Sequence, residues 1–198
     1  MDRKLKLLLK LSVNLSQEKE LPEILKKLNE ITKDLLNADR CSIFLHDKKT
    51  KELWTIVAHG VKEIRIKDDK GIAGLVFQKQ KRIEIEDAYE DSRFNKEVDK
   101  RTGYKTKSIL ATPMIDKKGK TIGVFQVINK LGAPKFTSED IELLNHMDMY
   151  ASSVIENALL YQELKKAHED VVNRLANATE YKDPETKNHI IRVGLYSY

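Results

Sequence analysis

The sequence predicts an α+β fold, an antiparallel sheet flanked by N- and C-terminal helices. Three observations predict it. Two amphipathic segments come first, short apolar runs of alternating pattern follow, and a long segment with apolar residues every three or four positions comes last. Strands grouped between helices, rather than alternating with them, are typical of an α+β protein. We therefore expect a sheet with helices packed on one face, followed by a long C-terminal signalling helix.

The first 37 residues are predicted to form two helices. Leucines at three- to four-residue spacing indicate a short helix over residues 3–15. Pro22 is tolerated in a first helical turn, and one apolar stripe follows it, so a second amphipathic helix is expected over residues 22–37.

The middle of the chain alternates in the manner of strands. A hairpin around the polar residues Asp116 to Gly119 is expected, with glycine available for a positive φ. Residues 71–80 are expected to form a short helix, and residues 87–103 a polar loop with a helical turn. The expected strands are residues 41–45, 53–58, an edge strand at Ile64 and Ile66, 83–85, 108–115 and 121–128.

A long helix is expected after Thr137 or Ser138, with Glu139 and Asp140 well placed in its first turn. Its apolar or small positions approximate a 3.5-residue period, which favours a parallel homodimeric stalk. These positions are Leu144, Met147, Ala151, Val154, Ala158, Tyr161, Leu164, His168, Val171, Leu175 and Ala178.

Composition narrows the classes of function. The 198 residues carry 36 Lys and Arg against 31 Asp and Glu, interspersed, with a net charge of +5. We therefore expect no nucleic-acid partner, because no concentrated basic face with stacking aromatics is visible in the sequence. No apolar run approaches the roughly 20 residues that span a bilayer, so no membrane association is expected. The single Cys41 fits a cytoplasmic protein.

Several segments in one order resemble the GAF domains of cyclic-nucleotide phosphodiesterases and adenylyl cyclases, over roughly residues 20–160. The resemblance implies a regulatory domain that senses a small molecule, with cyclic AMP or cyclic GMP as the candidate. The segments are Gly71-Ile72-Ala73-Gly74, Asp87-Ala88-Tyr89, Arg93-Phe94, Thr102 to Thr106, Ile109 to Pro113 and Gly123 to Lys130.

By that resemblance, six positions fall on the family's ligand pocket: Ser42, Ala73, Asp99, Thr102, Thr106 and Gln126. A helix start with close glycines can hold a cyclic phosphate, the threonines offer hydroxyls, and Asp99 and Gln126 can read base edges. Ala58 stands where relatives place an aromatic ring for base stacking, which leaves His59 or Trp54 as substitutes. A different small ligand, or a ligand-free dimerisation scaffold, stays open as an alternative.

The structural motif that the family calls NKFDE is matched by Asn129, Lys130, Phe136 and Asp140, with Ile141 in place of its last Glu. In the family the Lys and Asp form a pair. We expect it to hold the start of the long helix to the end of a strand, rather than to touch the ligand.

The tail is similar to the opening of HD-GYP domains, which hydrolyse cyclic-di-GMP. The matching residues are Glu180, Asp183, Thr186, His189, Arg192, Val193, Tyr196 and Ser197. In that family the residue matched by His189 is a metal ligand, and the other ligands come from further downstream. We therefore expect no catalysis and no cofactor in this chain, and a divalent metal in a full-length phosphohydrolase. An active phosphodiesterase fragment is the alternative.

These resemblances predict four regions along the chain. Residues 1–19 form an N-terminal helix, 20–160 the sensor domain, 161–176 a linker helix, and 177–198 the truncated start of the phosphohydrolase.

Overall fold

Nine elements make up the described part of this computed structural model, which covers residues 18, 20–57, 61–96, 99–100 and 103–180. The predicted helix over 3–15, Thr102 and the tail with His189 lie outside the described residues. The elements are α2 (Leu21–Leu35), β1 (Ala38–Asp47), β2 (Glu52–Val57), β3 (Val61–Lys67), α3 (Gly71–Lys79), β4 (Ile83–Ile85), β5 (Ile109–Ile115), β6 (Thr121–Lys130) and α5 (Ser138–Glu180).

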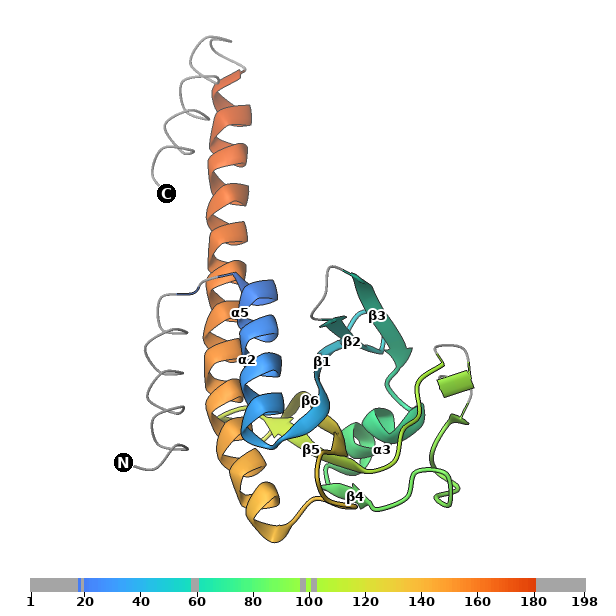
Figure 1. The fold of residues 1–198 in the computed structure, drawn as a ribbon. Helices are drawn as coiled ribbons and strands as arrows, with labels where there is room; N and C mark the ends of the chain where they lie inside the picture. Colours follow the sequence, from blue (N-terminus) through green and yellow to red (C-terminus); the bar gives the residue numbers. More distant parts are fainter. Residues whose placement is uncertain (1–17, 19, 58–60, 97–98, 101–102, 181–198) are drawn as a thin grey trace, which may run out of the picture. The chain divides into compact units, whose positions relative to one another are not determined.

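The strands form one six-stranded sheet in the order β3-β2-β1-β6-β5-β4 (Figure 1). Every neighbouring pair is antiparallel, which confirms the predicted α+β class with an antiparallel sheet. The central strands β1 and β6 have 10 residues each, so β1 extends well beyond the predicted 41–45 and β6 slightly beyond the predicted 121–128. Polar residues such as Asp39 and Lys130 extend them, because the ladder between the two strands continues past the apolar core.

Helix α2 forms where its apolar stripe predicts it. Pro22 lies in its first turn, where a missing N–H costs no hydrogen bond. Its buried face includes Ile24, Leu25 and Leu28, none of which is more than 1% exposed. This face covers the sheet beside β1, so burial of the stripe fixes the helix on the sheet.

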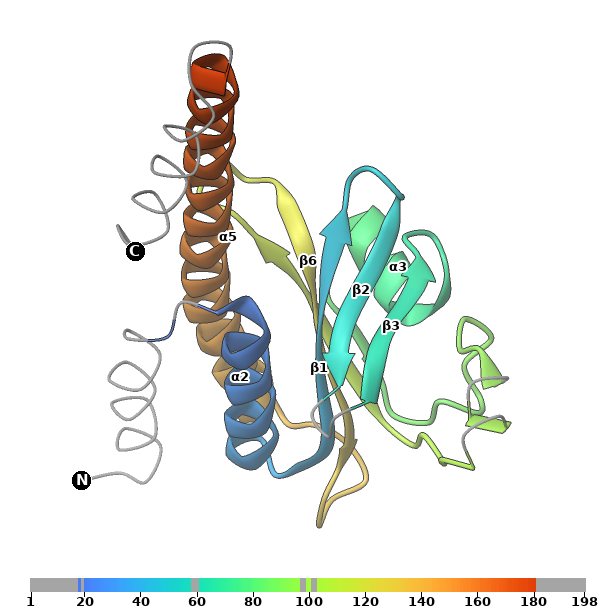
Figure 2. The same ribbon diagram turned by 90° about the horizontal axis from the view of Figure 1, so that it is seen from above.

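The sheet is covered on both faces, which corrects the expectation of helices on one face only. Helix α2 and the first half of α5 lie side by side on one face, and α3 lies on the other (Figure 2). Alternation along β6 serves both layers: Val124 packs in the cluster with α3, while the next residue, Phe125, is buried on the opposite side. The predicted short helix is confirmed as α3. The sequence of a nine-residue helix, however, does not show which face of the sheet the helix covers.

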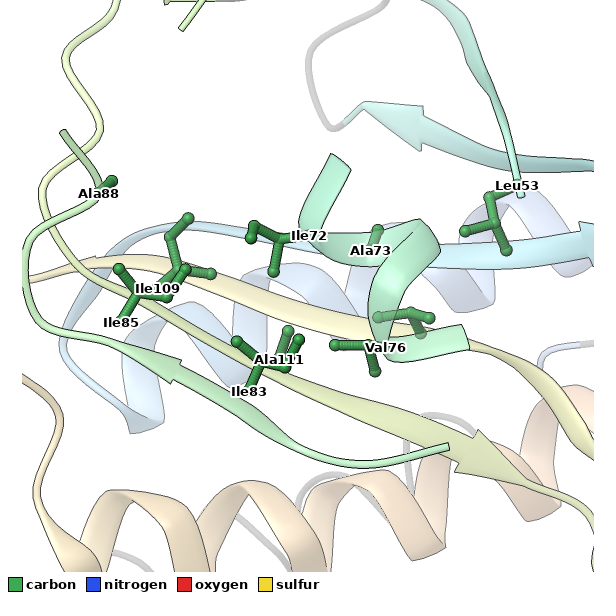
Figure 3. Packing of buried hydrophobic residues seen from close by; sticks show 10 residues of the cluster. Leu53, Ile72, Ala73, Val76, Ile83, Ile85, Ala88, Ile109 and Ala111 are labelled. Atoms are coloured by element: carbon green, nitrogen blue, oxygen red, sulfur yellow. The ribbon is translucent and has the colours of Figure 1, made fainter. Parts of the chain in front are cut away.

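The α3 layer is an apolar cluster (Figure 3). Ile72, Ala73 and Val76 from α3 meet Ala111 of β5 and Val124 of β6. β4 adds Ile83 and Ile85, and β2 adds Leu53. This cluster holds α3 against the sheet and so fixes the position of its N-terminal turn.

Helix α5 is unbroken over 43 residues, through both predicted boundaries at 160 and 176. Its start is capped reciprocally, since Asp140 N donates to Thr137 Oγ1 at 3.2 Å and Thr137 N donates to Asp140 Oδ2 at 2.8 Å. The chain divides into two compact units, Met1–Glu156 and Asn157–Tyr198. None of the described helices has the length and apolar character needed to cross a membrane.

Candidate ligand-binding site

Two of the predicted ligand residues face each other across the centre of the sheet. Ser42 of β1 is paired with Gln126 of β6, and Gln126 is paired in turn with Ala111 of β5. Paired residues of antiparallel strands point to the same face. Because Ala111 belongs to the cluster under α3, the half-buried Ser42 and Gln126 side chains also face the α3 layer.

The start of α3 lies over this layer. Ala73 is 3% exposed and packs in the apolar cluster, and Gly71 begins the helix with φ +66°. At Gly74 a Cβ would come within 2.8 Å of the Asp69 carbonyl carbon, so only glycine lets the preceding turn fold back this closely. The first amides of a helix have no intrahelical acceptor and carry partial positive charge. An anion is therefore favoured at this helix start.

The loop before β5 is closed by a buried carboxylate. Asp99 accepts hydrogen bonds from the backbone N of Thr106 at 2.6 Å, from Thr106 Oγ1 at 2.9 Å and from the Tyr89 hydroxyl at 3.2 Å. Asp99 and Thr106 are 4% and 3% exposed. Both carboxylate oxygens accept hydrogen bonds within residues 89–106, so Asp99 holds this loop together. A contact of Asp99 or Thr106 with a ligand stays a prediction.

Asn129 fixes the same loop to the sheet. Its Oδ1 accepts from the backbone N of Lys107 at 2.6 Å, and its Nδ2 donates to the Lys105 carbonyl at 2.9 Å. The residue has φ +58°, a conformation that asparagine tolerates better than most residues. One side chain at the end of β6 thus satisfies the backbone of the segment that carries Thr106.

Lys130, the next residue, contacts the helices on the opposite face of the sheet. Its Nζ donates to the Leu36 carbonyl at the end of α2 and to Asp140 Oδ1 in the first turn of α5, both at 2.7 Å. Burial alone would raise the pKa of Asp140, but the hydrogen bonds from Lys130 and Thr137 outweigh it and lower that pKa. Phe136 is buried beside this junction at 8% exposure. Asn129, Lys130 and Asp140 therefore join the loop before β5, α2 and α5 at the end of β6.

Comparison with known proteins identifies the family of this fold. The model of the GAF domain matches residues 20–153. The chain belongs to the GAF domain family. The match ends near the predicted boundary at 160, inside α5.

Curated relatives of this GAF domain are phosphodiesterases. A probable 3',5'-cyclic phosphodiesterase, pde-5, of Caenorhabditis elegans is 34% identical over 160 residues, which is 74% of this chain and 22% of that protein. The dual 3',5'-cyclic-AMP and -GMP phosphodiesterase 11A of Takifugu rubripes is 34% identical over 187 residues, 84% of this chain and 21% of that protein. The chain therefore spans about a fifth of the length of these relatives.

Solved structures support the fold. The GAF domain of an Acinetobacter phosphoenolpyruvate-protein phosphotransferase superposes with a TM-score of 0.67 at 21% identity, covering 82% of this chain and 99% of that one. At this identity the likeness shows the fold alone.

Trp54 does not face the layer that contains Ser42 and Gln126. Trp54 is paired with Leu45, and its neighbour Leu53 is the β2 residue in the cluster with α3. Alternation along the strand therefore turns Trp54 to the α2 side, which corrects the suggestion that it could stack on a base. Ala58 and His59 lie outside the described residues.

Tyr104 joins β1, β6 and the loop before β5 through contacts that the sequence did not predict. The Arg40 guanidinium lies 3.6 Å from the centre of its ring, and its hydroxyl donates to Asp39 and accepts from Asn129 Nδ2. Burial raises the pKa of Tyr104, and the Asp39 hydrogen bond raises it further. No local pattern could have shown this, because the partners come from β1, β6 and the loop.

A hollow of about 490 Å³ lies elsewhere, and none of the predicted ligand residues lines it. It is lined by Glu84, Ile85, Glu86, Asp87, Glu90, Asp91 and Pro134. Three of its carboxylates are already paired, with Arg82, Lys135 and Arg93. Within the described ranges no group of three His, Cys, Asp or Glu residues is arranged to hold a metal.

Proposed function

We propose that this GAF domain is a regulatory module that binds a small molecule, with cyclic AMP or cyclic GMP as the candidate, between α3 and the sheet. The pairing of Ser42 with Gln126 on the face that α3 covers carries the proposal. In this pair a hydroxyl and an amide lie side by side on the sheet face that α3 covers.

The chemistry of this layer suits a cyclic nucleotide. The amides at the start of α3 would hold the single negative charge of the cyclic phosphate. Ser42 and Gln126 would hydrogen-bond the base, since a Gln amide supplies both a donor and an acceptor. Apolar residues around Ala73 would cover the sugar and part of the base. The curated relatives are named for hydrolysing cyclic nucleotides, which supports this class of ligand without identifying it.

The direct test is isothermal titration of the chain with cyclic AMP, cyclic GMP and cyclic-di-GMP. We expect heat with one of the first two, and a loss of about 1 to 2 kcal/mol of binding free energy in Gln126→Ala. Gln162→Ala, at an exposed position of α5, is the matched control and should bind as the native chain does. No heat with any nucleotide, in a chain that melts cooperatively, would remove nucleotide sensing and leave the scaffold.

Ligand binding would affect the helices through the residues at the end of β6. Asn129 fixes the loop that carries Thr106, while Lys130 holds the ends of α2 and α5. A ligand that shifts the loop would thus bias the packing of both helices. The coupling free energy available to such a ligand is typically about 1 to 3 kcal/mol.

We further propose that the chain forms a parallel homodimer through its terminal helices. In the second half of α5 the predicted seam is exposed: Tyr161 at 37%, Leu164 at 68%, Val171 at 54% and Leu175 at 56%. Burying such a stripe against a second copy would form a coiled-coil seam. Sedimentation equilibrium should give twice the chain mass of 22.9 kDa. A monomer at all concentrations would contradict it.

The output is proposed to be an attached HD-GYP-type phosphohydrolase, on the resemblance of residues 180–197 that the sequence shows. In that case His189 would be one ligand of a divalent metal centre completed by downstream residues. The rival, an active fragment, predicts metal-dependent hydrolysis of cyclic-di-GMP by this chain alone. We expect none above the rate without protein.

A further inference from the structure

Arg40 lies on the same face of the sheet as the candidate ligand site. It comes two residues before Ser42 on β1, and alternate residues of a strand point to the same face, about 7 Å apart. Strand pairing continues the row of Arg40 through Ile128 of β6 to Ile109 of β5. Because Ile109 belongs to the cluster with α3, the pairing independently places Arg40 on the face that α3 covers.

Helix α3 covers the β5 side of this row and leaves the β1 side exposed. Ile109 is buried, and Ile72 from the first turn of α3 packs in the same cluster (Figure 3). Ile128 is half-buried and Arg40 is exposed. Two strand spacings, about 10 Å, separate β1 from β5. Arg40 and the first turn of α3 therefore flank the exposed part of the row.

A tyrosine ring holds the guanidinium of Arg40. The Cζ atom of Arg40 lies 3.6 Å from the centre of the Tyr104 ring. The Tyr104 hydroxyl donates to Asp39 and accepts from Asn129 Nδ2 at 2.9 Å, which fixes the far end of the ring. Stacking of this kind restricts the guanidinium plane without using its N–H groups. The planar fork of Arg40 is therefore held in one orientation.

The N–H groups of Arg40 are left for a ligand. Among the residues that the structure describes, no carboxylate forms an ion pair with this guanidinium, and the neighbouring Asp39 accepts from Tyr104 instead. An arginine has five N–H donors and no acceptor, and its fork matches two acceptors that lie side by side. We therefore expect a ligand group with two adjacent acceptors on a planar edge.

Only one of the two candidate nucleotides presents that pair. Guanine has the acceptors N7 and O6 on one edge, whereas adenine has the N6 amino donor beside N7. A guanidinium would donate two hydrogen bonds to guanine, but on adenine one of its donors would meet another donor. The cyclic phosphate has a different place, because the first amides of α3 favour an anion on the β5 side.

We propose that Arg40, oriented by Tyr104, binds the N7 and O6 edge of guanine and so selects cyclic GMP over cyclic AMP. The inference rests on the proposed function, since it requires a cyclic nucleotide between α3 and the sheet. Ser42 and Gln126 do not distinguish the two bases, because a hydroxyl and an amide each supply both a donor and an acceptor. Arg40 supplies donors alone, so it is the residue that determines specificity.

The test is isothermal titration of the chain with cyclic GMP, cyclic AMP and 7-deaza-cyclic GMP, which lacks the N7 acceptor. The native chain should bind cyclic GMP about tenfold more tightly than either of the other two. Arg40→Ala should weaken the binding of cyclic GMP about tenfold and that of cyclic AMP less than about threefold. Arg40→Lys keeps the charge without the fork and should also reduce the preference for cyclic GMP.

Three further variants separate base recognition from folding. Tyr104→Phe keeps the ring and should keep the preference for cyclic GMP, whereas Tyr104→Leu removes the ring and should lower it about threefold. Arg82→Ala, at an exposed position directly before β4 at the opposite edge of the sheet, should leave both affinities within about twofold. Melting temperatures check that each variant folds. The 7-deaza comparison needs only the native chain, so it decides the N7 contact even where a variant does not fold.

The outcomes separate this inference from the proposed function. A native chain that prefers cyclic AMP, or that binds cyclic GMP and its 7-deaza analogue equally, would overturn the role of Arg40 while a nucleotide sensor remains. The same conclusion would follow if Arg40→Ala weakened both nucleotides equally. No binding of either nucleotide would remove the proposed function and this inference together.

Discussion

The two halves of α5 have the same apolar period but different surroundings. In the first half Leu144, Met147 and Ala151 are fully buried at 0% exposure. In the second half, Leu164 and Leu175 are 68% and 56% exposed in the described chain. The period of a helix therefore shows that one face is apolar, but not what covers that face. One half is core, and the other is available for a partner.

The largest difference between the halves should appear on truncation of a leucine. Leu144→Ala should lower the free energy of unfolding by about 2 to 5 kcal/mol, because it leaves a cavity in a packed core. Leu160→Ala, at a 56% exposed position, should change it by less than about 0.5 kcal/mol. Urea denaturation followed by circular dichroism measures both. Equal effects would mean that the second half is also packed in solution.

The next largest effect on the free energy of unfolding should come from the ion pair that holds the first half of α5. Lys130→Met leaves Asp140 without its ion-pair partner, and the two side chains are only 14% and 11% exposed. We expect a loss of about 2 to 4 kcal/mol in the free energy of unfolding. Lys135→Met breaks an ion pair with Glu86 whose side chains are 56% and 70% exposed, and should cost less than about 1 kcal/mol. A similar small loss for both would show that the junction does not fix α5.

A half-buried carboxyl, that of Asp148, also distinguishes the halves. Burial raises the pKa of Asp148 to about 7, and its Oδ1 has no hydrogen-bond partner in the described part of the chain. The folded chain then keeps a proton up to about pH 7 that the unfolded chain releases near pH 4. The free energy of unfolding therefore falls as the pH rises toward 7 and is constant above it. We expect a loss of about 2 to 3 kcal/mol between pH 5 and pH 7.

Asp148→Asn should remove most of this pH dependence, whereas Asp170→Asn, at an exposed position in the second half, should leave it unchanged. Melting temperatures of the three chains from pH 5 to pH 8 measure the effect. The same slope in all three would mean that Asp148 is ionised throughout that range.

The smallest effect on unfolding of the sheet should come from the exposed stripe. Leu164→Asp/Leu175→Asp should leave the urea midpoint of the sheet unit unchanged and convert a dimer to a monomer, because charges are unfavourable in a coiled-coil seam. Sedimentation velocity distinguishes the two masses. A dimer that survives this double substitution would place the contact elsewhere.

Much of the fold could be predicted from local pattern. The apolar stripe of α2, the alternation of β5 and β6, and the start of α5 near Ser138 lie within one to three residues of their predicted bounds. The order of motifs also predicted the family, because many short matches in one sequence are jointly specific. The candidate site was predicted less completely. Ser42, Ala73 and Gln126 share one layer, whereas Asp99 and Thr106 are occupied with each other.

The sequence by itself determined the elements, their order and the family, because periodicity, capping and turn residues act over a few neighbouring positions. Only the tertiary structure decided that α3 covers the second face, that Trp54 turns away from it, and that Tyr104 lies between Arg40 and Asn129. Antiparallel pairing joins residues across the sheet, and no local pattern specifies which strands become neighbours.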